Sequence, residues 1–226
     1  PDDADAHAGL GDALAAQGER AAAEKQYLRA IQLQPDHAGA HKSYAFLLAR
    51  AGNHAAAAAQ FREAIAADPD AANAHLGLAD ALVRTNAFEA AEEQYQATLR
   101  LDPGNALAHN NYGDLLSRLN RGDAAIAQYE QALASDPDNP NTHTNLGLVL
   151  ANQNRLEEAE QRLRRAVELA PGHYGAQFTL GDVLLRRGQP EEAIPHLQQA
   201  VLAQPDWDKA RKRLEEARAR AADAGP

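Results

Sequence analysis

Histidines recur along the chain at a constant interval of 34 residues. Such an array could hold metal ions or sense pH, because imidazole is a common metal ligand that titrates near pH 6.5. A zinc site needs its ligand nitrogens about 2.0–2.1 Å from one ion, whereas helices in neighbouring packed units lie about 8–10 Å apart. We therefore expect each histidine to pack locally and bond to a neighbouring group, with coupled protonation as the alternative. The histidines are His7, His41, His75, His109 and His143.

Residues that could act as nucleophiles or bind phosphate are few. The chain has no cysteine, which excludes a thiolate nucleophile, a disulfide framework, Cys-ligated zinc and iron–sulfur clusters. Ser43, Ser117 and Ser135 do not lie in a nucleophile elbow, and the chain contains neither a P-loop nor a dinucleotide-binding glycine motif. We expect no enzyme activity, no cofactor and no metal site.

The acidic composition argues against several kinds of partner. The 226 residues contain 22 Lys+Arg against 32 Asp+Glu, a formal net charge of −10. Such a charge opposes non-specific adhesion to nucleic acid and to anionic lipid. The longest apolar run, Ala55–Ala59, is far too short to span a bilayer. We expect a soluble protein that binds no nucleic acid and does not insert into membranes, and its compartment stays undetermined.

The elements that carry these residues follow the same 34-residue period. Prolines stand 34 residues apart from Pro1 to Pro205, and no insertion interrupts them. Residues of like type recur at positions 4, 7, 8 and 11 of each period and again at 20, 24, 27 and 28, which is helical spacing in each half. Each period predicts a pair of helices, and residues 1–226 are therefore expected to form one all-α array. If the proline is position 32, the repeats are 4–37, 38–71, 72–105, 106–139, 140–173 and 174–207.

Turn residues mark the ends of both helices in a repeat. Position 15 is Gly or Asn in every repeat, the residue types that best tolerate the left-handed conformation after a helix. Proline at position 32 stops the second helix, and Asp36, Asp70, Asp138 or Asp206 after it is expected to cap the next helix. Position 8 is Gly or Ala and position 20 is always Ala, so the two helices of a pair should approach closely.

These repeated residues resemble the tetratricopeptide repeat over residues 4–207. The similarity rests on Leu-Gly at positions 7–8, leucine at 11, alanine at 20 and 27, an aromatic at 24 and proline at 32, with close matches at 111–113 and 145–147. The resemblance implies a right-handed α-solenoid, a superhelix of six helix-turn-helix repeats. Its first helices would line a concave groove that binds peptides or proteins and has no catalytic residues. Residues 208–222 resemble the capping helix that ends such an array, with Ala210, Leu214 and Ala217 in one stripe.

The residues expected in the groove are mostly polar and lie at positions 2, 5, 6, 9, 12 and 13. Asparagines at position 6 match the family's peptide-holding asparagines. Arginines at position 13 present guanidinium groups that can donate two hydrogen bonds to a carboxylate. Aspartates four residues before three of these arginines offer an alternative, an ordinary solvated i, i+4 pair. Phe46 replaces the asparagine of the family's carboxylate clamp, so that pattern is not reproduced. The predicted binding residues are Lys42, Arg50, Asn73, Asp80, Arg84, Asn110, Asn111, Asp114, Arg118, Asn145, Asn152 and Arg186.

The leading functional hypothesis is a non-enzymatic scaffold that holds an extended peptide or protein segment in the groove, chiefly through repeats two to five. A second is self-association: Pro1 stands at position 32 of a repeat that is not present, so an exposed stripe on repeat one could stack molecules into dimers or filaments. A third makes the array the substrate-recognition portion of a larger enzyme, as in relatives fused to glycosyltransferases. The identity of the partner does not follow from the sequence.

Overall fold

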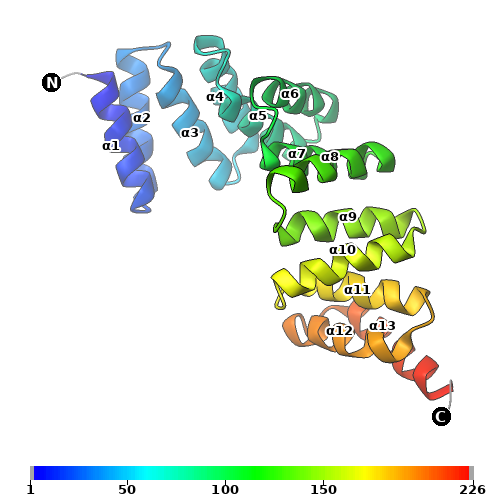
Figure 1. The fold of residues 1–226 in the computed structure, drawn as a ribbon. Coiled ribbons are helices and arrows are strands. Elements are labelled where there is room, and N and C mark those ends of the chain that lie inside the picture. Colours follow the sequence, from blue (N-terminus) through cyan, green and yellow to red (C-terminus); the bar gives the residue numbers. More distant parts are fainter. Residues whose placement is uncertain (1–2, 224–226) are drawn as a thin grey trace. The chain divides into compact units, whose positions relative to one another are not determined.

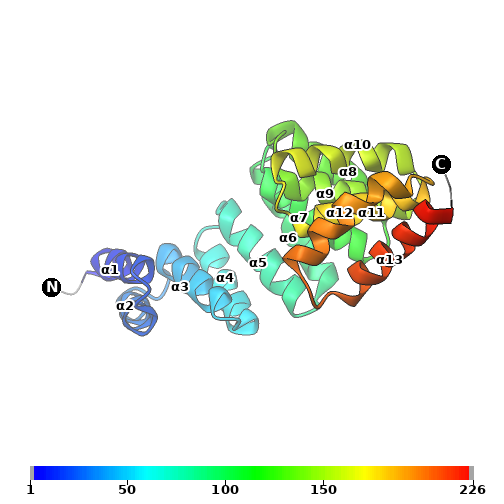
Figure 2. The same ribbon diagram turned by 90° about the horizontal axis from the view of Figure 1, so that it is seen from below.

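The computed structural model describes residues 3–223, and all regular secondary structure in that range is α-helical. The chain divides into two compact units, Pro1–Ala108 and His109–Pro226, which are described one at a time. In both units the helices follow one another as the pairs that the 34-residue period predicts (Figures 1 and 2).

The first unit contains three helix pairs, one for each of the repeats 4–37, 38–71 and 72–105. The first helix of each pair has 13 residues and the second has 14, so the repeats are alike in length as well as in sequence. The helices are α1 (Ala4–Ala16), α2 (Arg20–Leu33), α3 (Ala38–Arg50), α4 (His54–Ala67), α5 (Ala72–Arg84) and α6 (Phe88–Leu101).

The second unit follows the same plan and ends in a single additional helix. The additional helix, α13, packs against α11 and α12 and buries Ala210, Leu214 and Ala217, which confirms the predicted capping stripe. The helices are α7 (Ala106–Arg118, in which the division between the units falls), α8 (Gly122–Ser135), α9 (Pro140–Asn152), α10 (Leu156–Leu169), α11 (Tyr174–Arg186), α12 (Pro190–Ala203) and α13 (Asp208–Asp223).

Within each unit the first helices of neighbouring pairs contact each other. Helix α1 contacts α3, α3 contacts α5, and α9 contacts α11. Among the described residues, the backbones of the second helices α2 and α4, α4 and α6, or α10 and α12 do not come as close, although the side chains of Arg164 and Glu192 pair between α10 and α12. The backbones of neighbouring first helices therefore lie closer together than the backbones of neighbouring second helices. Each unit therefore curves with its first helices on the inner side.

The turn inside each pair has the backbone that the sequence predicts. The residue at position 15 has a positive φ in all six repeats, between 59° and 81°. Asparagine and glycine tolerate this left-handed region, which most side chains avoid. The residues are Gly18, Gly52, Asn86, Asn120, Asn154 and Gly188, and the prediction for this turn is confirmed.

Small residues bring the two helices of a pair into contact, as predicted. A Cβ added to Gly113 would lie 2.6 Å from the ring of Tyr129, and one added to Gly147 would lie 2.6 Å from Leu163. The alanines at position 20 are fully buried: Ala23, Ala57, Ala91, Ala125, Ala159 and Ala193 are each 0% exposed. Close helix packing thus accounts for the alanine at position 20 of every repeat.

The aspartates after the repeat proline do not cap the next helix, contrary to the prediction for Asp36, Asp70 and Asp138. The residue with non-helical backbone before α3, α5 and α9 lies one position later, at position 34. His37 Nδ1 accepts a hydrogen bond from the Ala40 N–H at 3.1 Å. The equivalent Asn139 Oδ1 accepts from two backbone N–H groups at 3.1 and 3.2 Å. The aspartates therefore stand in the turn, outside the capping position.

Candidate functional site

The α1–α3 hollow is a cavity of 280 Å³ on the inner side of the first unit. One wall comes from the C-terminal half of α1 and the other from α3, with a tyrosine of α2 below them. Its surface combines apolar walls with a hydroxyl, a carboxylate and a guanidinium. The lining residues are Asp12, Ala15, Ala16, Tyr27, Ser43, Phe46, Leu47 and Arg50.

Three side chains of α3 stand four residues apart and form the α3 line: Lys42, Phe46 and Arg50. The Phe46 side chain is 42% exposed and meets the Phe61 ring edge-on, with centroids 4.9 Å apart. Lys42 is half-buried and Arg50 is exposed. Neither cation forms a hydrogen bond or an ion pair with any residue in the range 3–223. The line therefore offers two unneutralised cations on either side of an exposed aromatic ring.

Aspartates at the position equivalent to Phe46 hold buried tyrosines. The Tyr27 hydroxyl donates to Asp12 at 2.8 Å, and the Tyr95 hydroxyl donates to Asp80 at 2.6 Å. Burial raises the pKa of Tyr27, and the bond to the neighbouring carboxylate raises it further. The predicted groove residue Asp80 thus lies on the inner face, where its carboxylate accepts a hydrogen bond from the core.

In the second unit, predicted groove residues join one another in an inter-repeat network. Asp114 Oδ1 accepts from the Tyr129 hydroxyl at 2.7 Å and from Asn145 Nδ2 at 2.8 Å. Asn110 Oδ1 accepts from the Thr142 hydroxyl at 3.0 Å and from Asn145 Nδ2 at 3.5 Å. Asn110 Nδ2 also donates to the neighbouring Asn111 at 3.2 Å. We call these groups the Asp114 network.

The arginines at position 13 differ in what they contact. Arg186 donates to the Ala151 carbonyl at 2.8 Å and to Asn154 Oδ1 at 3.3 Å, both in the preceding repeat. Arg220 of α13 reaches the Leu185 carbonyl at 3.5 Å in the same way. Arg84 is exposed, and its side chain makes no hydrogen bond or ion pair among the described residues. Position 13 therefore fastens one repeat to another at the C-terminal end of the second unit.

The remaining predicted site residues, Asn73, Arg118 and Asn152, are exposed on their first helices. Asp182 stands four residues before Arg186 but pairs with Arg213 of α13 at 2.7 Å, so the i, i+4 pairing that the sequence offered does not form there.

Sequence reasoning missed the α1 wall of the hollow and the Tyr–Asp pairs. The sequence did carry a signal for these pairs, because positions 9 and 24 vary together. Asp occurs with Tyr in three repeats, and Phe46 occurs with Phe61 in one.

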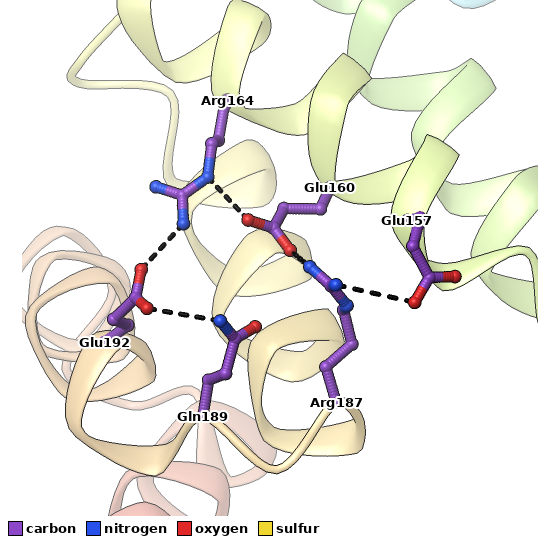
Figure 3. A network of polar contacts seen from close by, with 6 residues as sticks. All are labelled: Glu157, Glu160, Arg164, Arg187, Gln189 and Glu192. Carbon is purple, nitrogen blue, oxygen red and sulfur yellow. Dashed lines mark hydrogen bonds and ion pairs between the residues drawn. The ribbon is translucent and has the colours of Figure 1, made fainter.

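Charged side chains on the second unit pair with one another in a cluster (Figure 3). The Glu160 side chain, only 12% exposed, pairs with Arg164 at 2.7 Å and also with Arg187. Arg164 continues to Glu192 at 2.7 Å, and Arg187 lies 3.4 Å from Glu157. These contacts link α10 to Arg187, the residue that follows α11, and to α12, so the cluster holds repeats five and six together.

The recurring histidines are local packing groups, as expected. His7, His41, His75 and His109 each place Nδ1 within 2.7–2.8 Å of a glutamine side-chain amide 19 residues later. The Nε2–H of His41 donates to the Pro35 carbonyl at 2.9 Å. Repeat six exchanges the two residues, with Gln177 donating to the Pro171 carbonyl and His196 bound to Gln177. Within residues 3–223 no three His, Cys, Asp or Glu side chains come together as a metal site.

His143 in repeat five departs from this pattern. Its Nε2–H donates to the Pro137 carbonyl at 2.8 Å, but its buried Nδ1 has no partner among the described residues. Burial lowers the pKa of His143, and the nearby Arg162 and Arg165 lower it further. The ring is therefore neutral in the folded protein at neutral pH.

Comparisons with known proteins agree on one family. A family model described as tetratricopeptide repeat matches residues 45–106, 76–140, 113–174 and 144–206, and a second with the same description matches residues 4–37. No curated protein sequence matches the chain. Among the described residues, no helix combines the length and apolar character that crossing a bilayer requires.

Solved structures share the fold at low sequence identity. YrrB, described as a TPR protein with an unusual peptide-binding site, is 24% identical, with a TM-score of 0.68 over 82% of this chain and 96% of YrrB. PilF of Pseudomonas aeruginosa is 17% identical, with a TM-score of 0.82 over 96% of both chains. MamA of Desulfovibrio magneticus RS-1 is 19% identical, with a TM-score of 0.68 over 76% of this chain and 97% of MamA. These likenesses show an all-α helical repeat solenoid.

Proposed function

Because this chain belongs to the tetratricopeptide repeat family, we propose that it is a non-enzymatic scaffold that binds an extended peptide or protein segment along the inner faces of its first helices. The observation that carries this proposal is the α1–α3 hollow. Its lining includes the exposed Phe46 ring and Arg50, and Lys42 stands one helical turn before Phe46 on the same helix; neither cation forms an ion pair with a described residue. An exposed apolar group rimmed by polar side chains is typical of a protein-interaction site.

The second unit supports the same function in a different way. The Asn145 Nδ2 donates a hydrogen bond to Asp114, and the Asn145 Oδ1 has no hydrogen bond to any described residue. An amide oxygen held in a fixed orientation can accept a hydrogen bond from the backbone of a bound peptide, whatever the peptide's side chains. Asn111, Asn145 and Arg118 are therefore the groups that we propose for the second unit.

A peptide-display selection on the whole chain tests the proposal. We expect selected peptides whose affinity falls when first-helix residues are changed, by Lys42→Gln and Arg50→Gln in the first unit or by Asn111→Ala, Asn145→Ala and Arg118→Ala in the second. Arg62→Gln on α4 is the matched control, because Arg62 is an exposed arginine on a second helix. A selection that yields no peptide, or only peptides that tolerate every first-helix change, would refute the scaffold function.

One observation favours self-association as a second candidate. Leu10 is 48% exposed, whereas its equivalents Leu78, Leu146 and Leu180 are 0–3% exposed. Leu28 of the same repeat is also 48% exposed. We propose that a second molecule can cover this face. Light scattering over a range of concentrations should then show a dimer that Leu10→Ser dissociates, and a monomer at every concentration would exclude it.

A further inference from the structure

The α3 line differs in charge from the equivalent lines on the other first helices. Positions 5, 9 and 13 of α3 carry a cation, an aromatic ring and a cation. Where arginine occurs at position 13 of another first helix, aspartate stands at position 9. The lines in full are Ala8-Asp12-Ala16, Lys42-Phe46-Arg50, Leu76-Asp80-Arg84, Asn110-Asp114-Arg118, Thr144-Leu148-Asn152 and Phe178-Asp182-Arg186. The α3 line alone has a formal charge of +2, on a chain whose net charge is −10.

The spacing of the α3 line matches one particular kind of ligand. Residues eight apart on a helix are separated by about 12 Å along the axis. In an extended peptide, alternate side chains point to the same side, and residues i and i+4 are separated by about 13 Å. A peptide with acidic side chains at i and i+4 and an aliphatic side chain at i+2 would therefore meet Lys42, Phe46 and Arg50 together.

The α1–α3 hollow has the size and lining for the central side chain. Its volume of 280 Å³ is below the range of about 300–1,000 Å³ that is usual for drug-sized ligands, so it suits one side chain. Ala15, Ala16 and Leu47 form apolar walls beside Phe46. The Asp12 carboxylate also faces the hollow, which disfavours a carboxylate in the middle and favours an uncharged side chain there.

The Arg50 end of the line is reinforced by a second cation. A hollow of 200 Å³ adjoins the first and shares Arg50 with it, and Arg20 lines its other side. Arg20 is exposed, and its guanidinium has no hydrogen bond or ion pair within residues 3–223. Two arginines beside one hollow provide several donors for a carboxylate.

Building on the scaffold function above, we propose that the α1–α3 hollow binds an extended acidic segment of a partner protein with the pattern acidic–x–aliphatic–x–acidic. The aliphatic side chain enters the hollow against Phe46 and Leu47. One carboxylate pairs with Lys42, and the other pairs with Arg50 and Arg20. The chain's net negative charge repels acidic proteins in general, so this small cationic area also provides selectivity.

Fluorescence anisotropy with the whole chain tests this directly. The probe is a short labelled peptide that contains Glu-Ser-Leu-Ser-Glu. Peptides with Gln-Ser-Leu-Ser-Gln or Glu-Ser-Ser-Ser-Glu in its place serve as ligand controls. Loss of the aliphatic side chain should weaken binding about tenfold. Loss of both carboxylates should weaken it by a similar factor and abolish the salt dependence that screening gives the parent peptide.

Protein variants locate the binding. Lys42→Gln and Arg50→Gln should each weaken binding about threefold, the usual range for exposed ion pairs. Phe46→Asp recreates the aspartate that four other repeats carry at this position and should abolish binding while the chain still folds. Phe46→Leu keeps an apolar side chain, as repeat five does with Leu148, and should keep most of the affinity. Arg186→Gln should leave the peptide affinity unchanged, because Arg186 is bound to the Ala151 carbonyl in the second unit.

Equal affinity for the Glu and Gln peptides, or for wild type and a Lys42→Gln/Arg50→Gln double variant, would overturn the proposal. Peptide-display selection separates this failure from failure of the scaffold function. Selected peptides without acidic residues that still depend on first-helix groups would leave the scaffold function intact and refute only the acidic pattern. If display yields no peptide and Glu-Ser-Leu-Ser-Glu does not bind, both are wrong.

Discussion

The α3 line and the Asp114 network use the same repeat positions, but their side chains have different partners. In the Asp114 network, Asn110, Asp114 and Asn145 bond to one another and to the buried Tyr129. In the α3 line, Lys42 and Arg50 have no polar partner among the described residues, and Phe46 is 42% exposed. A position on the inner face of a repeat therefore does not by itself make a residue available to a partner.

The difference arises from a pair of positions inside each repeat. An aspartate at position 9 accepts a hydrogen bond from a tyrosine at position 24, as Asp114 does from Tyr129. When both positions are phenylalanine, as Phe46 and Phe61 are, the two rings pack edge-on and no carboxylate is present. Lys42 and Arg50 then have no carboxylate at position 9 of their own helix. We infer that the Asp114 network contributes mainly to stability and the α3 line mainly to binding.

The largest expected effect tests the stability half of this comparison. Asp114→Ala removes the acceptor for both the Tyr129 hydroxyl and Asn145 Nδ2, and Tyr129 is only 1% exposed. Unsatisfied buried donors should lower the free energy of unfolding by about 2–3 kcal/mol. Urea unfolding followed by the fluorescence of Trp207, the single tryptophan of the chain, measures it in the second unit. Arg50→Gln, followed by circular dichroism, should stay within about 0.5 kcal/mol of wild type; equal costs for the two variants would contradict the comparison.

Two glycines at position 6 give the next effect. A Cβ on Gly9 would meet no atom within 4 Å, whereas one on Gly77 would overlap the ring of Phe61. Gly9→Ala should stabilise the first unit by about 0.5–1 kcal/mol, because glycine is unfavourable inside a helix. Gly77→Ala should destabilise it by about 1–2 kcal/mol through overpacking. Thermal unfolding compares the two, and effects of the same sign would show that the inner face of repeat one is not open.

Buried histidines of the second unit give a pH-dependent effect, because burial lowers the pKa of His196 as well as that of His143. Burial lowers the pKa of His143, so the folded chain holds the ring neutral while the unfolded chain takes up a proton near pH 6.5. The contribution to stability is therefore complete above pH 6.5 and is lost as the pH falls below it. His143→Gln should reduce this acid sensitivity, because the equivalent Gln177 donates to its own proline carbonyl. Urea midpoints at pH 7 and pH 5 measure it; an unchanged pH dependence in the variant would assign the effect to other groups.

Much of the fold follows from the sequence, because the 34-residue period repeats each structural requirement six times. The Gly or Asn with positive φ at position 15 and the fully buried alanine at position 20 could be predicted one residue at a time. The capping residue could not, because the chain has aspartate next to the position that the backbone uses. Which groove residues stay unpaired depends on contacts about 31–35 residues apart, such as Asn145 with Asp114 and Arg186 with Ala151. Side-chain type alone does not encode those contacts.

The smallest expected effect compares two arginines at position 13. Arg186 donates to the Ala151 carbonyl, whereas Arg84 has no polar partner among the described residues. Arg186→Gln should cost about 0.5–1 kcal/mol, the net value of one hydrogen bond, and Arg84→Gln should cost less than about 0.5 kcal/mol. Parallel urea titrations resolve the two if the slopes are equal. If Arg84→Gln costs as much as Arg186→Gln, then exposure without a visible partner is not a sign of availability, and the argument that sets the α3 line apart as a binding surface loses its basis.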